Sequence, residues 1–292
     1  MTPEDIEHLA ALLKARSGLI LGADKTYLIE SRLAPIARKE GFANVAGLLT
    51  ALRTRRDEKV ILAVVDAMTT NETFFFRDKT PFDQFKSDVL PAFAKSRISG
   101  DIKVWCAACS TGQEPYSLAM MMDEARAQFP RINLDILATD ISDRCLEKAQ
   151  AGLYTQFEVQ RGLPITMMVK NFEKVDEMWR ISPKMRQGVR FRKYNLLDDL
   201  RGLGRMDVIY CRNVLIYFDI ATKKRVLEQM ATMLADDGYL FLGAAETVLG
   251  ITDAFKPLQG TRGLYVKNMS ASASLRPSAT SSLPPLRAAG AA

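Results

Sequence analysis

The chain has 292 residues, of which 48% are hydrophobic and 25% are charged, and its formal net charge is +6 at pH 7. This composition excludes a disordered or fibrous protein and suffices for one large or two modest domains. The N-terminus carries no secretory signal pattern and no run of about 18 apolar residues occurs, so we predict a cytoplasmic protein without membrane insertion.

The first 68 residues predict a small all-α domain. Thr2 is a helix N-cap followed by Pro3 at the first helical position, and apolar residues then recur at helical spacing up to Gly18. Further helical patterns follow, the second of which we expect to be interrupted at Pro35.

Residues 69–80 form an unusual linker because three consecutive phenylalanines, Phe74 to Phe76, cannot all face one side of a helix or strand. The segment must therefore be clamped between two surfaces. Polar Asn71, Thr73 and Arg77 alternate with the aromatic residues, which is typical of a ligand-lining segment, although a simple packing seam between domains gives the same pattern.

After a predicted helix over about 81–94, residues 102–105 predict a buried strand, followed by a loop of small residues that ends at Gly112. Glu114 and Pro115 then begin a helix. A strand, a tight turn and a helix N-terminus is the arrangement with which doubly wound sheets hold a cofactor.

The next strand ends in a carboxylate, Asp140, at the position where such sheets bind the two hydroxyls of a ribose. The dinucleotide and phosphate-loop motifs are both absent, and the loop before Glu114 is neutral, which suits a ligand without phosphates. S-adenosylmethionine (SAM) fits this description better than NAD or ATP. The alternative is an ordinary βαβ turn with no ligand.

Metal chemistry and histidine catalysis find little support in the sequence. Cys106 and Cys109 have CxxC spacing, but no second cysteine pair or histidine cluster completes a zinc site, so we predict reduced core cysteines and no metal. His8 is the only histidine, which argues against a histidine general base.

Strands and helices continue to alternate to about residue 268, among them a helix over about 220–234 and a strand over 239–244. This alternation predicts an α/β, doubly wound, Rossmann-like parallel sheet. Residues 152–188 interrupt it as a basic insertion: from Gly152 to Tyr194 there are nine Lys or Arg residues and four acidic ones. From about residue 269 to 292 the composition of Ser, Ala and Pro predicts a disordered tail.

Laid out in this way, the chain resembles the chemotaxis receptor methyltransferases, the CheR family, over residues 1 to about 268. The matching segments, in order, are Thr69–Arg77, Ser110–Ser117, Ala138–Ile141, Asn195–Leu197 and Cys211–Phe218. The resemblance implies an all-α domain at 1–68, a linker at 69–80 that contributes to the cofactor pocket, and a SAM-binding catalytic domain at 81–268 with a small β-subdomain inserted at 152–188.

The resemblance also implies roles for individual residues. In the cofactor site these are Asn71, Thr73, Arg77, Glu114, Asp140, Asn195, Leu196, Arg212 and Asn213. Glu114 and Asp140 would hold the amino acid and ribose parts of SAM. For catalysis we select Arg77 as a clamp on the cofactor, together with Arg212 or Tyr217 to orient the acceptor carboxylate.

The implied reaction is esterification of glutamate side chains on the acid-rich cytoplasmic helices of chemoreceptors, with S-adenosylhomocysteine as the second product. We expect a monomer. Some members of the family grip a peptide at the receptor C-terminus through the β-subdomain, but residues 171–188 are short and lack a Gly-rich loop, so we predict that no such tether is used.

The chemistry agrees with the resemblance, because a glutamate carboxylate has a reference pKa near 4.3 and is already ionised at neutral pH, so methyl transfer needs no general base. Two alternatives are weaker. A nucleic-acid methyltransferase would suit the basic charge, but the motifs expected after the strand that ends at Cys211 are absent. The second alternative is a scaffold protein that binds SAM without catalysing methyl transfer. The presence of Arg77, Glu114 and Asp140 argues against this alternative.

Overall fold

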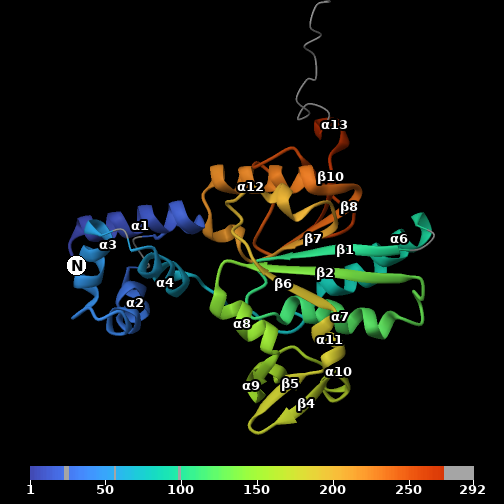
Figure 1. Cartoon of the computed structure of the whole chain (residues 1–292). Helices are drawn as coiled ribbons and strands as arrows, with labels where there is room; N and C mark the ends of the chain where they lie inside the picture. Colours follow the sequence, from blue (N-terminus) through green and yellow to red (C-terminus); the bar gives the residue numbers. More distant parts are fainter. Residues whose placement is uncertain (23–25, 56, 98–99, 273–292) are drawn as a thin grey trace, which may run out of the picture.

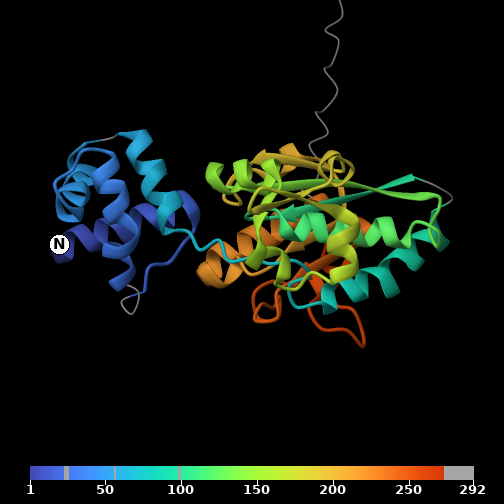
Figure 2. The ribbon, with the colours of Figure 1, turned by 90° about the horizontal axis from the view of Figure 1, so that it is seen from below.

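The computed structural model describes residues 1–22, 26–55, 57–97 and 100–272. Four helices come first: α1 (Pro3–Ser17), α2 (Tyr27–Lys39), α3 (Val45–Thr54) and α4 (Glu58–Met68). Thr2 caps α1 in a capping box, and Asn44 and Asp57 cap α3 and α4. The four helices share one core and form a separate group beside the sheet (Figure 2).

The predicted interruption at Pro35 is wrong, because α2 runs through it to Lys39. The side chain of this proline is exposed, so its ring lies on the solvent side of the helix. Only one intrahelical hydrogen bond is lost there, and the packing of Ile29, Leu33 and Ala37 in the core of the four helices compensates for it.

The linker leads into α5 (Thr80–Gln84), the π-helical turn η2 (Phe85–Val89) and α6 (Leu90–Ser96), where the sequence predicts one helix. A seven-stranded sheet follows, in the order β6-β2-β1-β7-β8-β10-β9. Its first five strands, in that spatial order, are β6 (Val189–Lys193), β2 (Ile132–Asp140), β1 (Gly100–Ala107), β7 (Met206–Cys211) and β8 (Leu234–Leu242), and neighbouring strands among them are parallel.

The last two strands depart from the predicted parallel arrangement. β10 (Leu264–Lys267) pairs antiparallel with β8, and β9 (Phe255–Pro257) pairs antiparallel with β10. No helix of crossover length separates β8 from this edge, so the chain returns by a hairpin-like connection. β8 also begins at Leu234, directly after the helix, and not near Tyr239 as the sequence indicates, because an irregularity opposite Met206 to Val208 lets the strand pair early.

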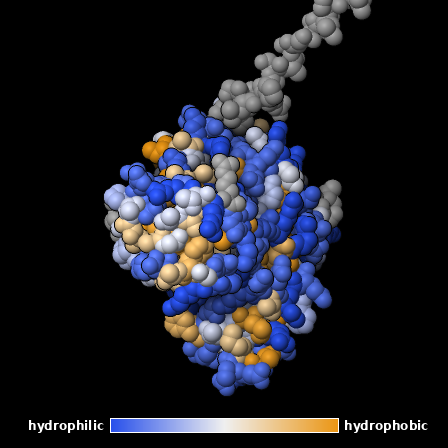
Figure 3. All heavy atoms as spheres, turned by 60° about the vertical axis from the view of Figure 1, so that its left-hand side comes forward, coloured by the Kyte–Doolittle hydropathy of each residue, from blue (hydrophilic) through white to orange (hydrophobic). Residues whose placement is uncertain are grey.

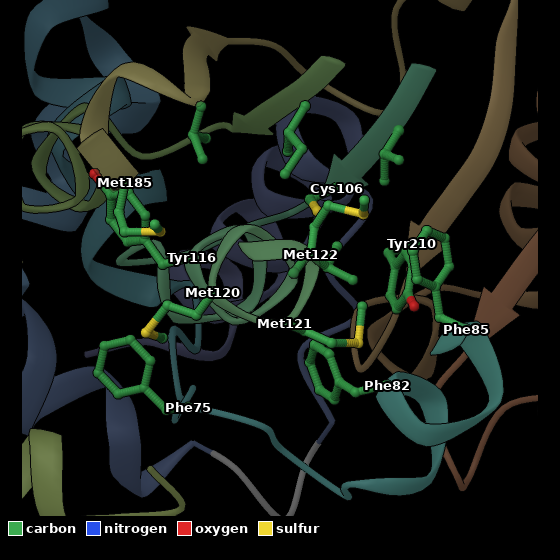
Figure 4. Packing of buried hydrophobic residues seen from close by; sticks show 14 of the residues in the cluster. Phe75, Phe82, Phe85, Cys106, Tyr116, Met120, Met121, Met122, Met185 and Tyr210 are labelled. Atoms are coloured by element: carbon green, nitrogen blue, oxygen red, sulfur yellow. The ribbon is translucent and has the colours of Figure 1, made fainter. Parts of the chain in front are cut away.

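Helices cover both faces of the sheet (Figure 1). α12 (Ile220–Met233) lies on one face, and α7 (Gln113–Ala125) and α8 (Asp143–Ala151) lie on the other. Successive residues of a strand point to opposite faces, so Val104 and Cys106 belong to the core on the α7 side, whereas Trp105 and Ala107 belong to the core on the α12 side. The α7 side is rich in methionine and aromatic side chains (Figure 4).

The basic insertion folds as a second, three-stranded sheet in the order β3-β5-β4. Its elements are β3 (Leu153–Thr155), α9 (Gln156–Gln160), α10 (Ile165–Asn171), β4 (Phe172–Val175), β5 (Met178–Ile181) and α11 (Pro183–Gln187). We call residues 152–188 the small sheet unit. It lies below α7 in Figure 1.

The three phenylalanines of the linker point to different partners, as the sequence predicts. Phe75 is fully buried against Tyr154 and Phe172 of the small sheet unit, with ring centroids 5.1 and 5.5 Å away. Phe76 contacts Phe82, and Phe74 lies under the Arg161 guanidinium.

The remaining elements are the 3-10 turns η3 (Leu200–Leu203) and η4 (Leu215–Tyr217), and the terminal helix α13 (Met269–Ser272). The predicted disordered tail therefore begins with a short helix, and its remainder, residues 273–292, lies outside the described residues. No helix in the described part of the chain is long and apolar enough to span a membrane.

Candidate active site

The largest concentration of predicted site residues lies at the carboxyl ends of β1, β2 and β7. The chain order of the strands reverses between β1 and β7, and ligands of open α/β sheets bind at such a point. A cleft of about 930 Å³, including its open mouth, lies there. It is lined by all ten residues selected from the sequence: Asn71, Thr73, Arg77, Glu114, Asp140, Asn195, Leu196, Arg212, Asn213 and Tyr217.

The floor of the cleft is the loop between β1 and α7. Ala108 and Ser110 adopt positive φ angles of 57° and 51°, so the loop turns sharply. The backbone N–H of Cys109 donates to the Thr139 carbonyl at 2.9 Å, and that of Ser110 donates to the Asp140 carboxylate at 2.8 Å. The loop is thus fastened to the end of β2.

Asp140 is almost fully buried, with 5% of its surface exposed. Its second carboxylate oxygen accepts the backbone N–H of Ser142 at 2.9 Å, and Ser142 in turn caps α8. Burial raises the pKa of Asp140, and the backbone hydrogen bonds to its carboxylate oppose that shift. The side chain is an anchored acceptor that lines the cleft and retains lone pairs for hydroxyl donors.

An ion-pair cluster centred on the buried Arg212 forms a second part of the cleft lining. Arg212, whose side chain is 1% exposed, donates to Glu114 and to Asp78, both at 2.7 Å. It also donates to the Arg77 carbonyl at 2.8 Å. Burial raises the pKa of Glu114, and the Arg212 guanidinium opposes that shift. Because two carboxylates already engage Arg212, its contacts favour a role in holding Glu114 over a direct role in orienting an acceptor.

The linker forms the rim of the cleft. Its start is held by Arg32 of α2, which donates to the carbonyls of Met68 and Thr69 at 2.7 and 3.0 Å. Further along, Arg77 donates to the Glu72 carbonyl at 2.6 Å and lies over the Phe74 ring. The linker is therefore an ordered part of the site.

The N-terminal helices also reach the cleft, a contribution that the sequence analysis missed. The end of α1 supplies Ser17 and, just after it, Leu19 to the lining. Two hydrogen bonds join this segment to the catalytic side: Asn195 donates to the Arg16 carbonyl at 2.7 Å, and Ile20 donates to the Tyr217 carbonyl at 2.9 Å. Helical periodicity gives no sign of these contacts, because they join segments far apart in the sequence.

Two further acidic residues were missed. Asp78 pairs with Arg212, and Glu246 accepts backbone N–H groups around Asn213. Glu246 follows the small residues after β8. Like Asp140, it is an acidic residue at the carboxyl end of a predicted strand, and this pattern could have indicated Glu246 as a site residue.

The cleft suits a ligand without phosphates that carries hydroxyl and ammonium groups. Its loop is neutral, and buried carboxylates stand on two of its walls. Within the described residues, no group of acidic, histidine or cysteine side chains has the arrangement of a metal site, and all four cysteines are free and buried.

Comparison with protein families agrees with this geometry. Residues 4–69 match the model described as "CheR methyltransferase, all-alpha domain", and residues 71–264 match "CheR methyltransferase, SAM binding domain". Chemotaxis protein methyltransferase Cher2 of Pseudomonas putida is 38% identical over 268 residues, covering 89% of this chain and 96% of that protein. Chemotaxis protein methyltransferase 1 of Pseudomonas aeruginosa is 39% identical over 271 residues, covering 90% and 97%.

Solved structures give a weaker match. The plantazolicin methyltransferase BpumL with a bound desmethyl analogue and S-adenosylhomocysteine aligns with 75% of this chain and 60% of its own, at 13% identity and a TM-score of 0.31. A SAM-dependent methyltransferase from Clostridium acetobutylicum aligns with 57% and 52%, at 16% identity and a TM-score of 0.32. Scores this low carry no argument about the site.

Proposed function

This chain belongs to the CheR family of SAM-dependent methyltransferases, and we propose that it esterifies glutamate side chains on the cytoplasmic helices of chemoreceptors. The observation that carries the proposal is the convergence of Asp140 and the Glu114–Arg212 pair on one cleft at the reversal point of the sheet. The products are a glutamyl methyl ester and S-adenosylhomocysteine.

Each wall of the cleft has a task in this proposal. The Asp140 carboxylate accepts the ribose hydroxyls, and Glu114 binds the ammonium group of the amino acid part. Asn71, Thr73 and Arg77 hold the cofactor from the linker side. Asn195, Leu196 and Asn213 border the adenine and methionine ends, with Arg212 holding Glu114 in place.

Bound SAM supplies a methyl group on a positively charged sulfur, which an oxygen nucleophile can displace. The acceptor carboxylate is already ionised at neutral pH, so the chain has to align it and exclude water, without removing a proton. Tyr217 is the residue proposed to align it, while Arg77 clamps the cofactor. The contacts of Arg212 with two carboxylates support an indirect part for that residue.

We propose the same division of the chain as the sequence predicts: helical domain 1–68, linker 69–80, catalytic domain 81–268 with the insertion 152–188, and tail 269–292. The protein acts as a cytoplasmic monomer. β4 and β5 are joined by a hairpin turn of only Asp176 and Glu177. This short turn supports methylation without a receptor tethering peptide, which receptor fragments with and without their C-terminal segment would test.

Charge on the small sheet unit and on β6 supports receptor docking, but less than the sequence count suggests. Five of the nine cations between Gly152 and Tyr194 pair with acids outside that segment: Arg161, Lys170, Lys184, Arg190 and Lys193. The exposed cations Lys174 and Arg192 are therefore the better candidates for contacts with acidic receptor helices.

The direct test is transfer of radiolabelled methyl from SAM to a chemoreceptor cytoplasmic fragment, followed by mild base. Label released as methanol is the expected result, because carboxyl methyl esters are base-labile. Label that resists base would contradict esterification and indicate methylation of nitrogen or sulfur. If nucleic acid then accepted more label than the receptor fragment, the alternative of a nucleic-acid methyltransferase would be favoured.

A second test addresses the cofactor site. Asp140→Ala should abolish SAM binding in calorimetry while the protein remains folded. Asp143→Ala is the matched control, since Asp143 lies nearby on α8 but its side chain is 64% exposed and pairs with Lys193. Unchanged SAM affinity of Asp140→Ala would remove the proposed role of Asp140.

A further inference from the structure

Glu246 is a nearly buried carboxylate, 9% exposed, that lies just after β8. It accepts four short hydrogen bonds from backbone N–H groups, at Asn213 (2.8 Å), Val214 (2.9 Å), Leu215 (2.7 Å) and Gly243 (2.7 Å). A longer one comes from Ile216 at 3.3 Å. Both carboxylate oxygens are used, so the side chain joins the loop after β7 to the end of β8.

The loop after β7 needs such a partner. Asn213 has a positive φ of 58°, a left-handed conformation that asparagine adopts more readily than most residues, so the chain turns sharply there. The four consecutive N–H groups from Asn213 to Ile216 all donate to Glu246. Without its carboxylate, the N–H group of the buried Leu215 would lose its acceptor, and so would those of its partly exposed neighbours. The Glu246 carboxylate therefore stabilises this turn by accepting its successive backbone N–H groups.

The fit around the carboxylate is close. A Cβ atom at Gly243 would lie 2.7 Å from the Glu246 carboxylate and 2.9 Å from the backbone nitrogen of Asn213. Only glycine lets the end of β8 approach both groups. The ends of β7 and β8 and the Glu246 carboxylate are therefore closely packed against one another.

The loop held in this way carries residues of the cleft. Asn213, Val214 and Tyr217 all line it. Tyr217 has a second anchor, because its carbonyl accepts the N–H of Ile20. The tyrosine therefore lies between the Glu246 clamp on one side and the segment after α1 on the other.

We propose that Glu246 is a positioning residue that acts through Tyr217, fixing it where it can align the acceptor carboxylate. The inference rests on the proposed function for the role of Tyr217. Asp140 and the Glu114–Arg212 pair have their own anchors, and Asn213 is the one proposed cofactor residue that the clamp holds directly, so loss of the Glu246 clamp should impair turnover more than SAM binding.

Glu246→Gln tests the clamp, because both oxygens of Glu246 accept N–H groups and an amide nitrogen at either position would face donors. We expect kcat to fall about 10- to 100-fold and the SAM Kd to change by less than about threefold. Glu246→Asp, which keeps the charge but shortens its reach, should recover part of kcat. Gly243→Ala, which pushes the carboxylate away without removing it, should reproduce the loss.

The matched control is Asp207→Asn. Asp207 is also 9% exposed, lies near the start of β7, at the opposite end of that strand from the loop that Glu246 holds, and accepts the Lys103 N–H and the Arg97 guanidinium, both at 2.8 Å. Its loss should lower stability with kcat retained. A kcat in Glu246→Gln within about twofold of the wild type, or a loss matched by Asp207→Asn, would overturn the inference.

A double variant tests the route through Tyr217. If Glu246 acts through this tyrosine, Glu246→Gln should cost little further activity in a Tyr217→Phe background, whereas multiplicative losses would contradict the route. Hydrogen exchange of a peptide covering 212–218 reports on the clamp without any acceptor, and it should accelerate in Glu246→Gln but not in Asp207→Asn. Failure of the wild type to methylate carboxylates would instead contradict the proposed function.

Discussion

At the scale of single residues, the cleft is built from charged groups that are themselves held by other groups. Asp140 is anchored by Ser110 and Ser142, and Glu114 by Arg212. Buried charges of this kind are costly unless they are paired, so each partner contributes both to stability and to the shape of the site.

Arg212→Lys should destabilise the protein and weaken SAM binding. A lysine ammonium cannot reproduce the fork that reaches Glu114, Asp78 and the Arg77 carbonyl together, so one buried group loses its partner, at a cost of about 1–3 kcal/mol. Thermal unfolding and calorimetry measure both effects. Arg201→Lys is the control, because Arg201 makes a similar ion pair with Asp199 at an exposed position, and equal effects in the two variants would contradict this account.

The pH dependence of SAM binding should reflect the raised pKa of Asp140. Only the ionised carboxylate accepts two ribose hydroxyls, so affinity is present above this raised pKa and declines as the pH falls through it, at a higher pH than for an ordinary aspartate near 3.9. The folding contribution has the opposite sign: a raised pKa in the folded state favours folding at low pH and loses this effect as the pH rises. Calorimetry at successively lower pH, starting from neutral pH, should show the decline in the wild type and a weaker one in Asp140→Asn.

At the scale of elements, the linker and the small sheet unit stabilise each other. Phe75 packs into the small sheet unit, and Gly162 of that unit approaches the Phe75 backbone so closely that a Cβ atom would lie 2.0 Å from its carbonyl oxygen. The rim of the cleft, which includes Arg77, therefore depends on an element inserted much later in the chain.

Gly162→Ala should be strongly destabilising and should also lower SAM affinity. Gly162 has a φ of +84°, and the added methyl group also clashes with the linker backbone, so we expect a loss of about 3 kcal/mol or more. Gly260→Ala separates the two causes, because Gly260 has a φ of +79° with open space around it, and it should cost only about 1 kcal/mol. Similar losses in chemical denaturation would show that the close approach does not matter.

At the scale of the whole molecule, the site belongs to no single part of the chain. The sheet supplies the floor, the linker the rim, and the end of α1 one wall. The view of the surface in Figure 3 is mostly hydrophilic, with hydrophobic areas that include its lower part, where Figure 1 places the small sheet unit. Exposed Phe157, Ile165 and Val169 belong to that unit.

Charge reversal at Lys174 of the small sheet unit, and at Arg192 of β6, should affect the receptor more than the cofactor. We expect Lys174→Glu, and separately Arg192→Glu, to lower kcat/KM for the receptor fragment at low salt, with a smaller difference from the wild type as salt increases. Arg225→Glu on α12, on the opposite face of the large sheet, is the control. Equal activity of all variants at every salt concentration would direct attention to the N-terminal helices as the docking surface.

The sequence by itself determined the parts of this protein that depend on local pattern. Periodicity, capping residues and strand ends predict the early helices, the strand, loop and helix around Gly112, and the acid at Asp140. The site residues at these positions meet in one cleft because the carboxyl ends of parallel strands lie at the same edge of the sheet. Local rules failed at Pro35 and at the start of β8, where packing and strand pairing outweigh propensity.

Only the tertiary structure decided which groups support these residues. The pairing of Arg212 with Glu114 and Asp78, the clamp of Glu246 on the loop after β7, and the approach of α1 to Tyr217 join segments that lie far apart in the chain. The ion pairs of five cations between Gly152 and Tyr194 with acids outside that segment are also contacts between distant parts of the chain. Such contacts depend on distances set by the packed fold, and a one-dimensional pattern carries no information about them.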